Sequence, residues 1–372
     1  MNKRIAALTL TITIVVIACR KDDPIIVPQE HTPALPAQPY DYVSASAFPS
    51  SFLYPPLSFI NSEPQSNPTT DWGATLGRVL FYDTQLSANN AVSCASCHKQ
   101  QNGFSDPARF SRGFAGGHTD RNSMAILNTR FSFRFFWDRR ANGLEEQVMM
   151  PVMNAVEMGT DTVFLPAKLS AISYYPGLFE HAFGTTEISN TRIARALAQF
   201  VRSINSWNSK YDEGLQNNFT NFTPEENDGR TFFMSGQFNC NHCHTTSNFY
   251  TTQALNNGLE SVVIDSGYAL VTGDPADIGK FKVPTLRNIG VTGPYMHDGR
   301  FATLEDVVEH YNSGIQGNPN LDDRLTVEAI TGGTPKQYNM TAYQKAALVA
   351  FLKTLTDEGL MADPKYSDPF VH

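Results

Sequence analysis

Two short stretches of the sequence share one frame: CASCH at residues 94–98 and CNHCH at residues 240–244. In each, two cysteines with two residues between them are followed directly by a histidine. Three interpretations are open for such a pentapeptide: a zinc site, a redox-active or disulfide-forming cysteine pair, or the attachment site of a c-type haem. The choice among them decides the fold.

The chain has five cysteines, four of which fall inside the two motifs: Cys94, Cys97, Cys240 and Cys243. A closed zinc site needs four ligands, so the two cysteines and one histidine of each motif would leave a zinc ion short of one. A thioredoxin-like pair gives no reason for a histidine in both copies. The spacing therefore favours two c-type haems, with the thiols bonded to the porphyrins and His98 and His244 bound to the irons.

The fifth cysteine, Cys19, closes an N-terminal segment with a basic start and an apolar run over residues 5–18. That run is too short for a spanning helix but suits a signal peptide. The letters VIAC at its end resemble a bacterial lipobox, in which Cys19 becomes the acylated first residue; an ordinary signal peptide is the alternative. We therefore expect a lipoprotein signal peptide over residues 1–19. The protein would lie in the cell envelope, periplasmic or anchored to the outer membrane through the lipid on Cys19.

Length and composition divide the rest of the chain. Its 372 residues, 41% of them hydrophobic, suffice for two domains. Ten of the 22 prolines lie within residues 24–70, so residues 20–70 are predicted to be a proline-rich tether. We expect an N-terminal haem domain over residues 71–215 and a C-terminal one over residues 216–372. A net charge of −8 argues against a nucleic-acid partner.

Helical patterns surround both motifs. The stretch GRVLF at residues 77–81 precedes the first motif, and GRTFF at 229–233 precedes the second, which indicates an internal duplication. The stretches 193–204 (IARALAQFVRSI) and 343–355 (YQKAALVAFLKTL) carry apolar residues on one helical face. Thr303 and Asp306 fit a capping box. No long alternating run predicts a sheet, so the expected class is mainly α, with two cytochrome-c-like domains.

The stretch at residues 136–159, FWDRRANGLEEQVMMPVMNAVEMG, bears on the reaction. Cleavage of a peroxide bond at iron needs a group that takes a proton from one oxygen and delivers it to the other, together with a group that orients the substrate. Glu157 and Gln147 could fill these roles. On composition alone, Glu157 could equally be a solvated surface carboxylate.

Residues 71–360 resemble the bacterial dihaem cytochrome c peroxidases. The matching segments follow in family order: LGRVLFYDTQLS, SCASCH, FWD, LEEQ, PVMNAVEMG and FKVPTLRNIGVTGPYMHDGRFATLEDVV. The resemblance implies that the N-terminal haem reacts with hydrogen peroxide and that the C-terminal haem delivers electrons to it. It also implies a small reduced cytochrome c or a cupredoxin as donor, and a possible homodimer.

The resemblance assigns roles to single residues. It places Gln147 and Glu157 in the peroxide pocket, with Pro151 in the wall of that pocket. It places Trp137 between the two haems, on the route of the electron.

The same resemblance implies a calcium site between the two domains. Its ligands would be Asn122, Thr292 and Pro294, whose amide and carbonyl oxygens, with waters, suit a hard cation.

The axial ligands depart from the family pattern. Many family members bind the second iron through a methionine fourteen residues after the HDG-type motif, but here that count from His297 reaches Tyr311. A tyrosine is what the related MauG enzyme has at this position. Met296 and His310 are alternative ligands. For the resting first iron, His118, in a glycine-rich loop, is the candidate ligand; the alternative is a loop histidine that does not bind, which would leave the first iron five-coordinate.

These residues leave three functions open. The leading interpretation is a peroxidase. The second is a MauG-like enzyme that oxidises residues of a protein through a bis-ferryl state. The third is a dihaem electron carrier without catalysis, which would leave Gln147, Glu157 and Trp137 without a role.

Overall fold

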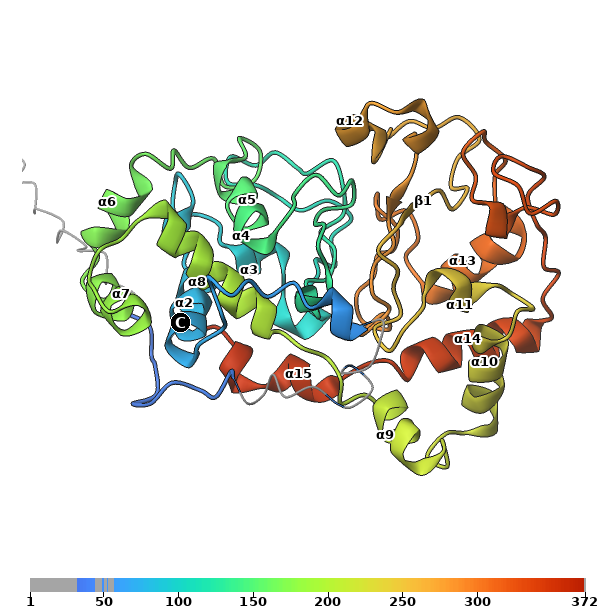
Figure 1. Ribbon diagram of the computed structural model, residues 1–372, viewed down its shortest axis with the longest axis horizontal. Coiled ribbons are helices and arrows are strands. Elements are labelled where there is room, and N and C mark those ends of the chain that lie inside the picture. Colours follow the sequence, from blue (N-terminus) through green and yellow to red (C-terminus); the bar gives the residue numbers. More distant parts are fainter. Residues whose placement is uncertain (1–31, 44–48, 50–51, 53–56, 371–372) are drawn as a thin grey trace, which may run out of the picture. The chain divides into compact units, whose positions relative to one another are not determined.

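The computed structural model describes residues 32–43, 49, 52 and 57–370 (Figure 1). The predicted signal peptide, with Cys19, lies outside these residues. Within the described part of the chain, no helix combines the length and apolarity needed to cross a membrane. The described residues fall in one compact unit.

The structure is mainly helical, as predicted. The longer helices are α2 (Asp71–Tyr82), α7 (Tyr175–Phe183), α8 (Asn190–Ser203), α9 (Lys210–Asn217), α10 (Pro224–Met234) and α14 (Ala342–Lys353). The shorter ones are α3 (Cys94–Cys97), α4 (Leu144–Gln147), α5 (Met150–Met153), α6 (Leu165–Ser170), α11 (Cys240–Cys243), α12 (Ala269–Thr272), α13 (Leu304–Glu309) and α15 (Glu358–Ala362). Among the described residues, the strands are β1 (Ala254–Leu255) and β2 (Phe281–Lys282), an antiparallel pair with Ala254 opposite Lys282.

The predicted duplication appears as two equivalent helix crossings (Figure 1). Helix α2 packs on α8, and a Cβ at Gly77 would lie 2.0 Å from the carbonyl oxygen of Ala196. Helix α10 packs on α14, where a Cβ at Gly229 would lie 1.8 Å from the carbonyl oxygen of Ala347. Only glycine permits such an approach, so the first residue of each GR-x-x-F stretch sets a helix crossing.

Each crossing contributes to its own hydrophobic core. The first core takes buried side chains from residues 42–204, and the second takes them from residues 211–355. The chain then returns to the first core, which also contains Leu360, Tyr366 and Phe370. The domain boundary near residue 215 stays a prediction.

The segment predicted as a tether contains residues that pack against the first core. Tyr42 is 1% exposed, and its hydroxyl donates to the carbonyl oxygen of Lys365 at 2.6 Å. Asn67 is also buried and donates to Glu145 at 2.8 Å. Proline content at residues 24–70 therefore does not imply a free segment throughout.

The local helix predictions are confirmed. Helices α8 and α14 bury the predicted apolar faces, although Ile204 and Leu355 lie just beyond the helix ends. Thr303 caps α13, with its hydroxyl accepting from the Asp306 amide and the Asp306 carboxylate accepting from the Thr303 amide, as in a capping box.

Candidate functional site: two haem-attachment motifs and their cavities

The first motif forms one helical turn that aims its histidine into a cavity. Helix α3 carries both thiols of CASCH, and the amide of His98 donates to the carbonyl oxygen of Cys94 at 3.0 Å. The Nδ1 atom of His98 lies 3.0 Å from the carbonyl oxygen of Phe104. A carbonyl only accepts, so Nδ1 carries the proton and Nε2 keeps its lone pair. His98 lines a cavity of about 820 Å³.

The second motif repeats this arrangement. Helix α11 carries the thiols of CNHCH, and the amide of His244 donates to the carbonyl oxygen of Cys240 at 3.1 Å. The Nδ1 atom of His244 lies 3.1 Å from the carbonyl oxygen of Phe249. Cys240, Cys243 and His244 all line a second, smaller cavity of about 210 Å³.

Burial keeps these side chains neutral. It lowers the pKa of His244 to about 4 and also lowers the pKa of His98. It raises the pKa of the Cys94 and Cys240 thiols to about 12. Neutral imidazole is the form that binds a metal.

The four motif cysteines are not joined in disulfides. Among the residues that the structure describes, no cluster of three or more His, Cys, Asp or Glu side chains could hold a metal ion.

A covalently attached haem fits the residues at both motifs. Each motif combines two thiols with a neutral imidazole that lines a cavity. Lys282 lines both cavities, and burial, followed by the repulsion of Arg139, lowers its pKa to about 8. Burial of a charged ammonium group is unfavourable unless an anion pairs with it, and the propionates of a porphyrin are suitable anions. Sequence reasoning did not single out Lys282.

The first cavity brings together the residues predicted for peroxide chemistry. Glu157, Gln147 and Pro151 all line the cavity that contains His98. Glu157 is half-buried, and desolvation raises the pKa of its carboxyl group, partly offset by the charge of Arg140. The cavity therefore holds a carboxyl group with an elevated pKa beside an amide that can both donate and accept.

Neighbouring segments fix the two polar residues. On α4, Glu145 accepts from the buried guanidinium of Arg202 at 2.6 Å, which anchors the helix that ends at Gln147. The carbonyl oxygen of Glu157 accepts from the Phe114 amide at 2.9 Å. A Cβ at Gly113 would lie 1.6 Å from the carbonyl oxygen of the residue before Glu157, so this loop fits against Glu157 only with glycine.

Trp137 lies in the wall that the two cavities share. Its indole Nε1 donates to the carbonyl oxygen of Asn122 at 2.8 Å. The Asn122 amide in turn donates to the carbonyl oxygen of His297 at 2.8 Å. Trp137 thus contributes to both cavities, and its position between two haems and its role in electron passage stay predictions.

Tyr311 and Met296 both line the second cavity, together with His244. Tyr311 lies in a turn of π-helix, His310–Gly314, and burial raises its pKa to about 12. His310, the other alternative ligand, places its Nε2 3.0 Å from the carbonyl oxygen of Asn257, so that nitrogen already has a partner. Tyr311 and Met296 therefore remain the candidate ligands.

The remaining predicted ligands have less defined surroundings. His118 is exposed but lines the first cavity, so its binding to the first iron stays a prediction. Asn122, Thr292 and Pro294 all line the second cavity. The Asn122 Nδ2 donates to two backbone carbonyls, at 3.1 and 3.2 Å, which orients Oδ1 away from them. The calcium site also stays a prediction.

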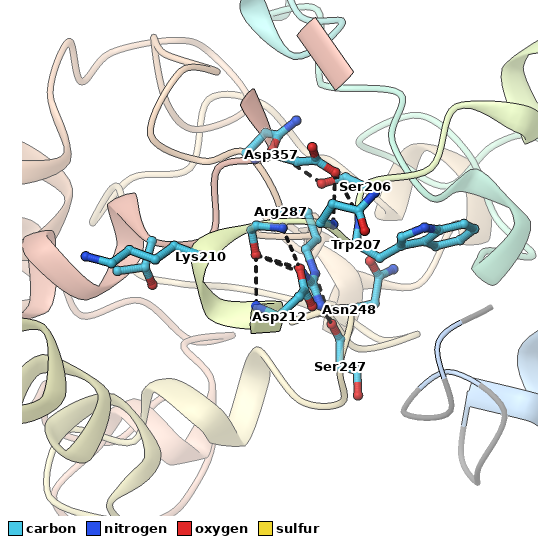
Figure 2. Close-up of polar contacts among 12 residues, drawn as sticks. Ser206, Trp207, Lys210, Asp212, Ser247, Asn248, Arg287 and Asp357 are labelled. Atoms are coloured by element: carbon cyan, nitrogen blue, oxygen red, sulfur yellow. Dashed lines mark hydrogen bonds and ion pairs between the residues drawn. The ribbon is translucent and has the colours of Figure 1, made fainter. Parts of the chain in front are cut away.

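A buried ion pair between Arg287 and Asp212 supports the loop that contains Ser247 and Asn248 (Figure 2). The Arg287 guanidinium donates to Asp212 at 2.5 Å, and Arg287 and Asp212 side chains are 0% and 10% exposed. Arg287 also donates twice to the carbonyl oxygen of Ser247, at 3.0 and 2.5 Å. Because Ser247 lies two residues before Phe249, this pair holds the loop that orients His244. Sequence reasoning missed it, since no spacing connects residues 212 and 287.

A second duplication also escaped sequence reasoning. Isolated bridges pair Phe135 with Ala141 and Tyr295 with Phe301, 160 positions later. Within these loops Asp138 pairs with Arg140, and Asp298 pairs with Arg300. The repeated D-x-R spacing at residues 138–140 and 298–300 was the available signal.

Comparisons with known proteins agree with this geometry. The sequence model of the family described as Di-haem cytochrome c peroxidase matches residues 72–220. The methylamine utilization protein MauG of Methylorubrum extorquens is 32% identical over 302 residues, which cover 79% of this chain and 81% of that protein. Cytochrome c551 peroxidase of Nitrosomonas europaea is 32% identical over 289 residues, covering 77% and 80%.

Among solved structures, a MauG-like protein associated with microbial copper homeostasis superposes with a TM-score of 0.77. It is 34% identical, and the match covers 87% of this chain and 99% of that chain.

Proposed function

Because the chain belongs to the di-haem cytochrome c peroxidase family, we propose that it reduces hydrogen peroxide to water with electrons from a small reduced cytochrome c or copper protein. The observation that carries the proposal is the convergence of Glu157, Gln147 and Pro151 on the cavity lined by His98. An electron carrier has no use for a carboxyl group there.

The proposed reaction joins one peroxide, two electrons and two protons into two waters. When bound, the haems supply the redox-active irons at which the O–O bond is broken and through which electrons arrive. The Glu157 carboxylate takes a proton from one peroxide oxygen and returns it to the other, for which a pKa raised by desolvation is suited. The Gln147 amide orients the peroxide, and Pro151 excludes water from one wall.

Electron delivery is supported by the contacts of Trp137. The indole of Trp137 donates to the carbonyl oxygen of Asn122, and the amide of Asn122 donates to the carbonyl oxygen of His297. Two hydrogen bonds, joined through the backbone of Asn122, therefore connect Trp137 with His297. An indole can pack as a core residue and relay an electron in the same position.

The test is the Glu157→Gln variant, which keeps the shape and removes the proton acceptor. With both haems bound, peroxide turnover with a reduced small cytochrome should fall about 10²- to 10⁴-fold. Glu146→Gln is the matched control, because it makes the same change at an exposed residue, one position before Gln147, that does not line the cavity. Unchanged turnover in Glu157→Gln would remove the carboxyl group from the mechanism.

A second candidate function is MauG-like oxidation of residues in a partner protein. Tyr311 favours it, because it lines the second cavity and stands where the resemblance to MauG implies a tyrosine ligand. An anionic phenolate favours ferric iron and would lower the potential of the second haem, whereas a thioether would raise it.

One assay separates the two functions: the rate of cytochrome oxidation by peroxide, measured from the fully ferric and from the half-reduced protein. Fast turnover from either state supports the peroxidase. Negligible turnover from both, together with a long-lived oxidised spectrum, supports the MauG-like function. Turnover only after reduction would implicate His118 as a resting ligand.

We also propose, from the sequence, an envelope location through lipid on Cys19, a calcium ion held by Asn122, Thr292 and Pro294, and a possible homodimer. The arrangement of the three predicted calcium ligands around one cavity supports the second of these.

A further inference from the structure

One amide reaches both candidate ligands of the second iron. Asn257 follows strand β1 and lines the second cavity. Its Nδ2 atom lies 3.4 Å from the Met296 sulfur and 3.5 Å from the Tyr311 hydroxyl oxygen. A side-chain amide has two N–H donors, so it can serve both acceptors at once.

The backbone around Asn257 is tied to both ends of the turn that carries Tyr311. The Nε2 atom of His310, the residue before Tyr311, lies 3.0 Å from the Asn257 carbonyl oxygen. The carbonyl oxygen of Gly258 accepts from the Gln316 amide at 2.8 Å. These two contacts bracket the π-helical turn, so the amide and the phenol keep their relative positions.

The hydrogen bond from the Asn257 amide to the Tyr311 oxygen differs in strength from its hydrogen bond to the Met296 sulfur. A phenolate oxygen bound to iron carries negative charge, and a hydrogen bond to a charged acceptor is about twice as strong as one between neutral groups. A thioether sulfur is a weak, neutral acceptor. The same amide therefore stabilises Tyr311 as an anionic ligand, whereas its hydrogen bond to Met296 engages one of the two lone pairs of the sulfur and makes the thioether a weaker donor to the iron.

We propose that Asn257 is a positioning residue that selects Tyr311 over Met296 as the axial ligand of the second haem. The inference rests on the haem sites of the proposed function and concerns the ligand of the second one. It assigns to Asn257 a role in setting the potential of that haem, without contact with peroxide.

The test uses the haem-loaded protein with two variants. Asn257→Leu keeps the size of the side chain and removes both N–H donors, and Asn257→Ser replaces the amide with a shorter side chain whose single hydroxyl does not extend as far. Both variants should show the charge-transfer absorption of thioether-bound iron in the reduced-and-reoxidised protein. The midpoint potential of the second haem should move to a more positive value, because thioether ligation favours ferrous iron. Gln253→Leu, an exposed change four residues earlier, should move neither.

Two further variants make the result decisive. In Asn257→Leu with Met296→Leu, the thioether absorption should be absent; if it persists, another methionine supplies it and the inference is wrong. A potential that is unchanged or lower, without thioether absorption, in both Asn257 variants would also overturn the inference.

Tyr311→Phe separates this inference from the function. If that variant leaves the ferric spectrum of the second haem unchanged, Tyr311 is not the ligand and the selection by Asn257 falls. The peroxidase function is judged independently, by cytochrome turnover in Glu157→Gln.

Discussion

Removing one partner of the buried pair between Arg287 and Asp212 should destabilise the protein strongly. Asp212→Asn keeps the shape of the side chain but removes the charge that faces Arg287, whose side chain is 0% exposed. Arg287 also packs against aromatic rings, including those of Tyr211 and Phe249, at 5.8 and 5.5 Å from their centres. The variant would thus leave a guanidinium in an apolar surrounding without a counter-charge.

The expected cost follows from this burial. Breaking a buried ion pair by removing one partner costs about 3–5 kcal/mol. One oxygen of Asp212 also accepts from the amide and hydroxyl of Ser209, at 2.9 and 2.6 Å. An asparagine keeps one acceptor oxygen for these donors, so we expect a loss near the lower end, about 3 kcal/mol.

Denaturant unfolding of the haem-loaded protein, followed by fluorescence, measures this loss as a shift in midpoint at constant slope. Asp212→Asn combined with Arg287→Met should recover part of it, because the unpaired charge is then gone. Glu305→Gln is the control, since Glu305 and Lys353 form a pair with side chains 62% and 59% exposed, worth at most about 1 kcal/mol. A loss below about 1 kcal/mol for Asp212→Asn would refute the inference that removing this carboxylate leaves the buried Arg287 charge without compensation.

Three further outcomes test the first cavity. Because the charge of Arg140 lowers the pKa of Glu157, Arg140→Met should raise that pKa. Turnover depends on the ionised carboxylate, so the acid limb of its pH profile should move to higher pH in this variant. Gly113→Ala should lower turnover at unchanged haem content, because its Cβ would lie 1.6 Å from the carbonyl oxygen of the residue before Glu157. Gly143→Ala is the control and should leave turnover unchanged, because there is open space around its Cβ. Trp137→Phe should slow electron transfer between the haems in stopped-flow measurements, with both haems still bound and peroxide binding unchanged.

Local patterns predicted much of the fold. The helical periodicity before residue 204 and the capping box at Thr303 depend on neighbours within a few positions, and both are confirmed. The cysteine spacing predicted the two attachment motifs, and the structure adds the carbonyl partner of each histidine. The predicted tether is the exception, since burial of Tyr42 depends on a contact with residue 365, far along the chain.

The residues that sequence reasoning missed depend on distant contacts. Lys282 looks like an ordinary basic residue until the fold places it between two cavities. Asn257 belongs to an unremarkable ALNNG stretch, and its meaning comes from Met296 and Tyr311, which are 39 and 54 positions away. Neither the type of these residues nor their local spacing predicts such contacts.

In the proposed function, the two halves of the chain differ in chemistry because single side chains differ within one repeated frame. Helices α4 and α13 begin at equivalent positions, Leu144 and Leu304, 160 residues apart. In this register Pro151, which cannot bind a metal through its side chain, corresponds to Tyr311, which can. Both line the cavity of their own half. With Pro151 in the first half, the first iron would stay accessible to peroxide. With Tyr311 in the second half, the second iron would be bound by a side chain. One change of residue within the repeated frame would therefore produce this difference, without any change of fold.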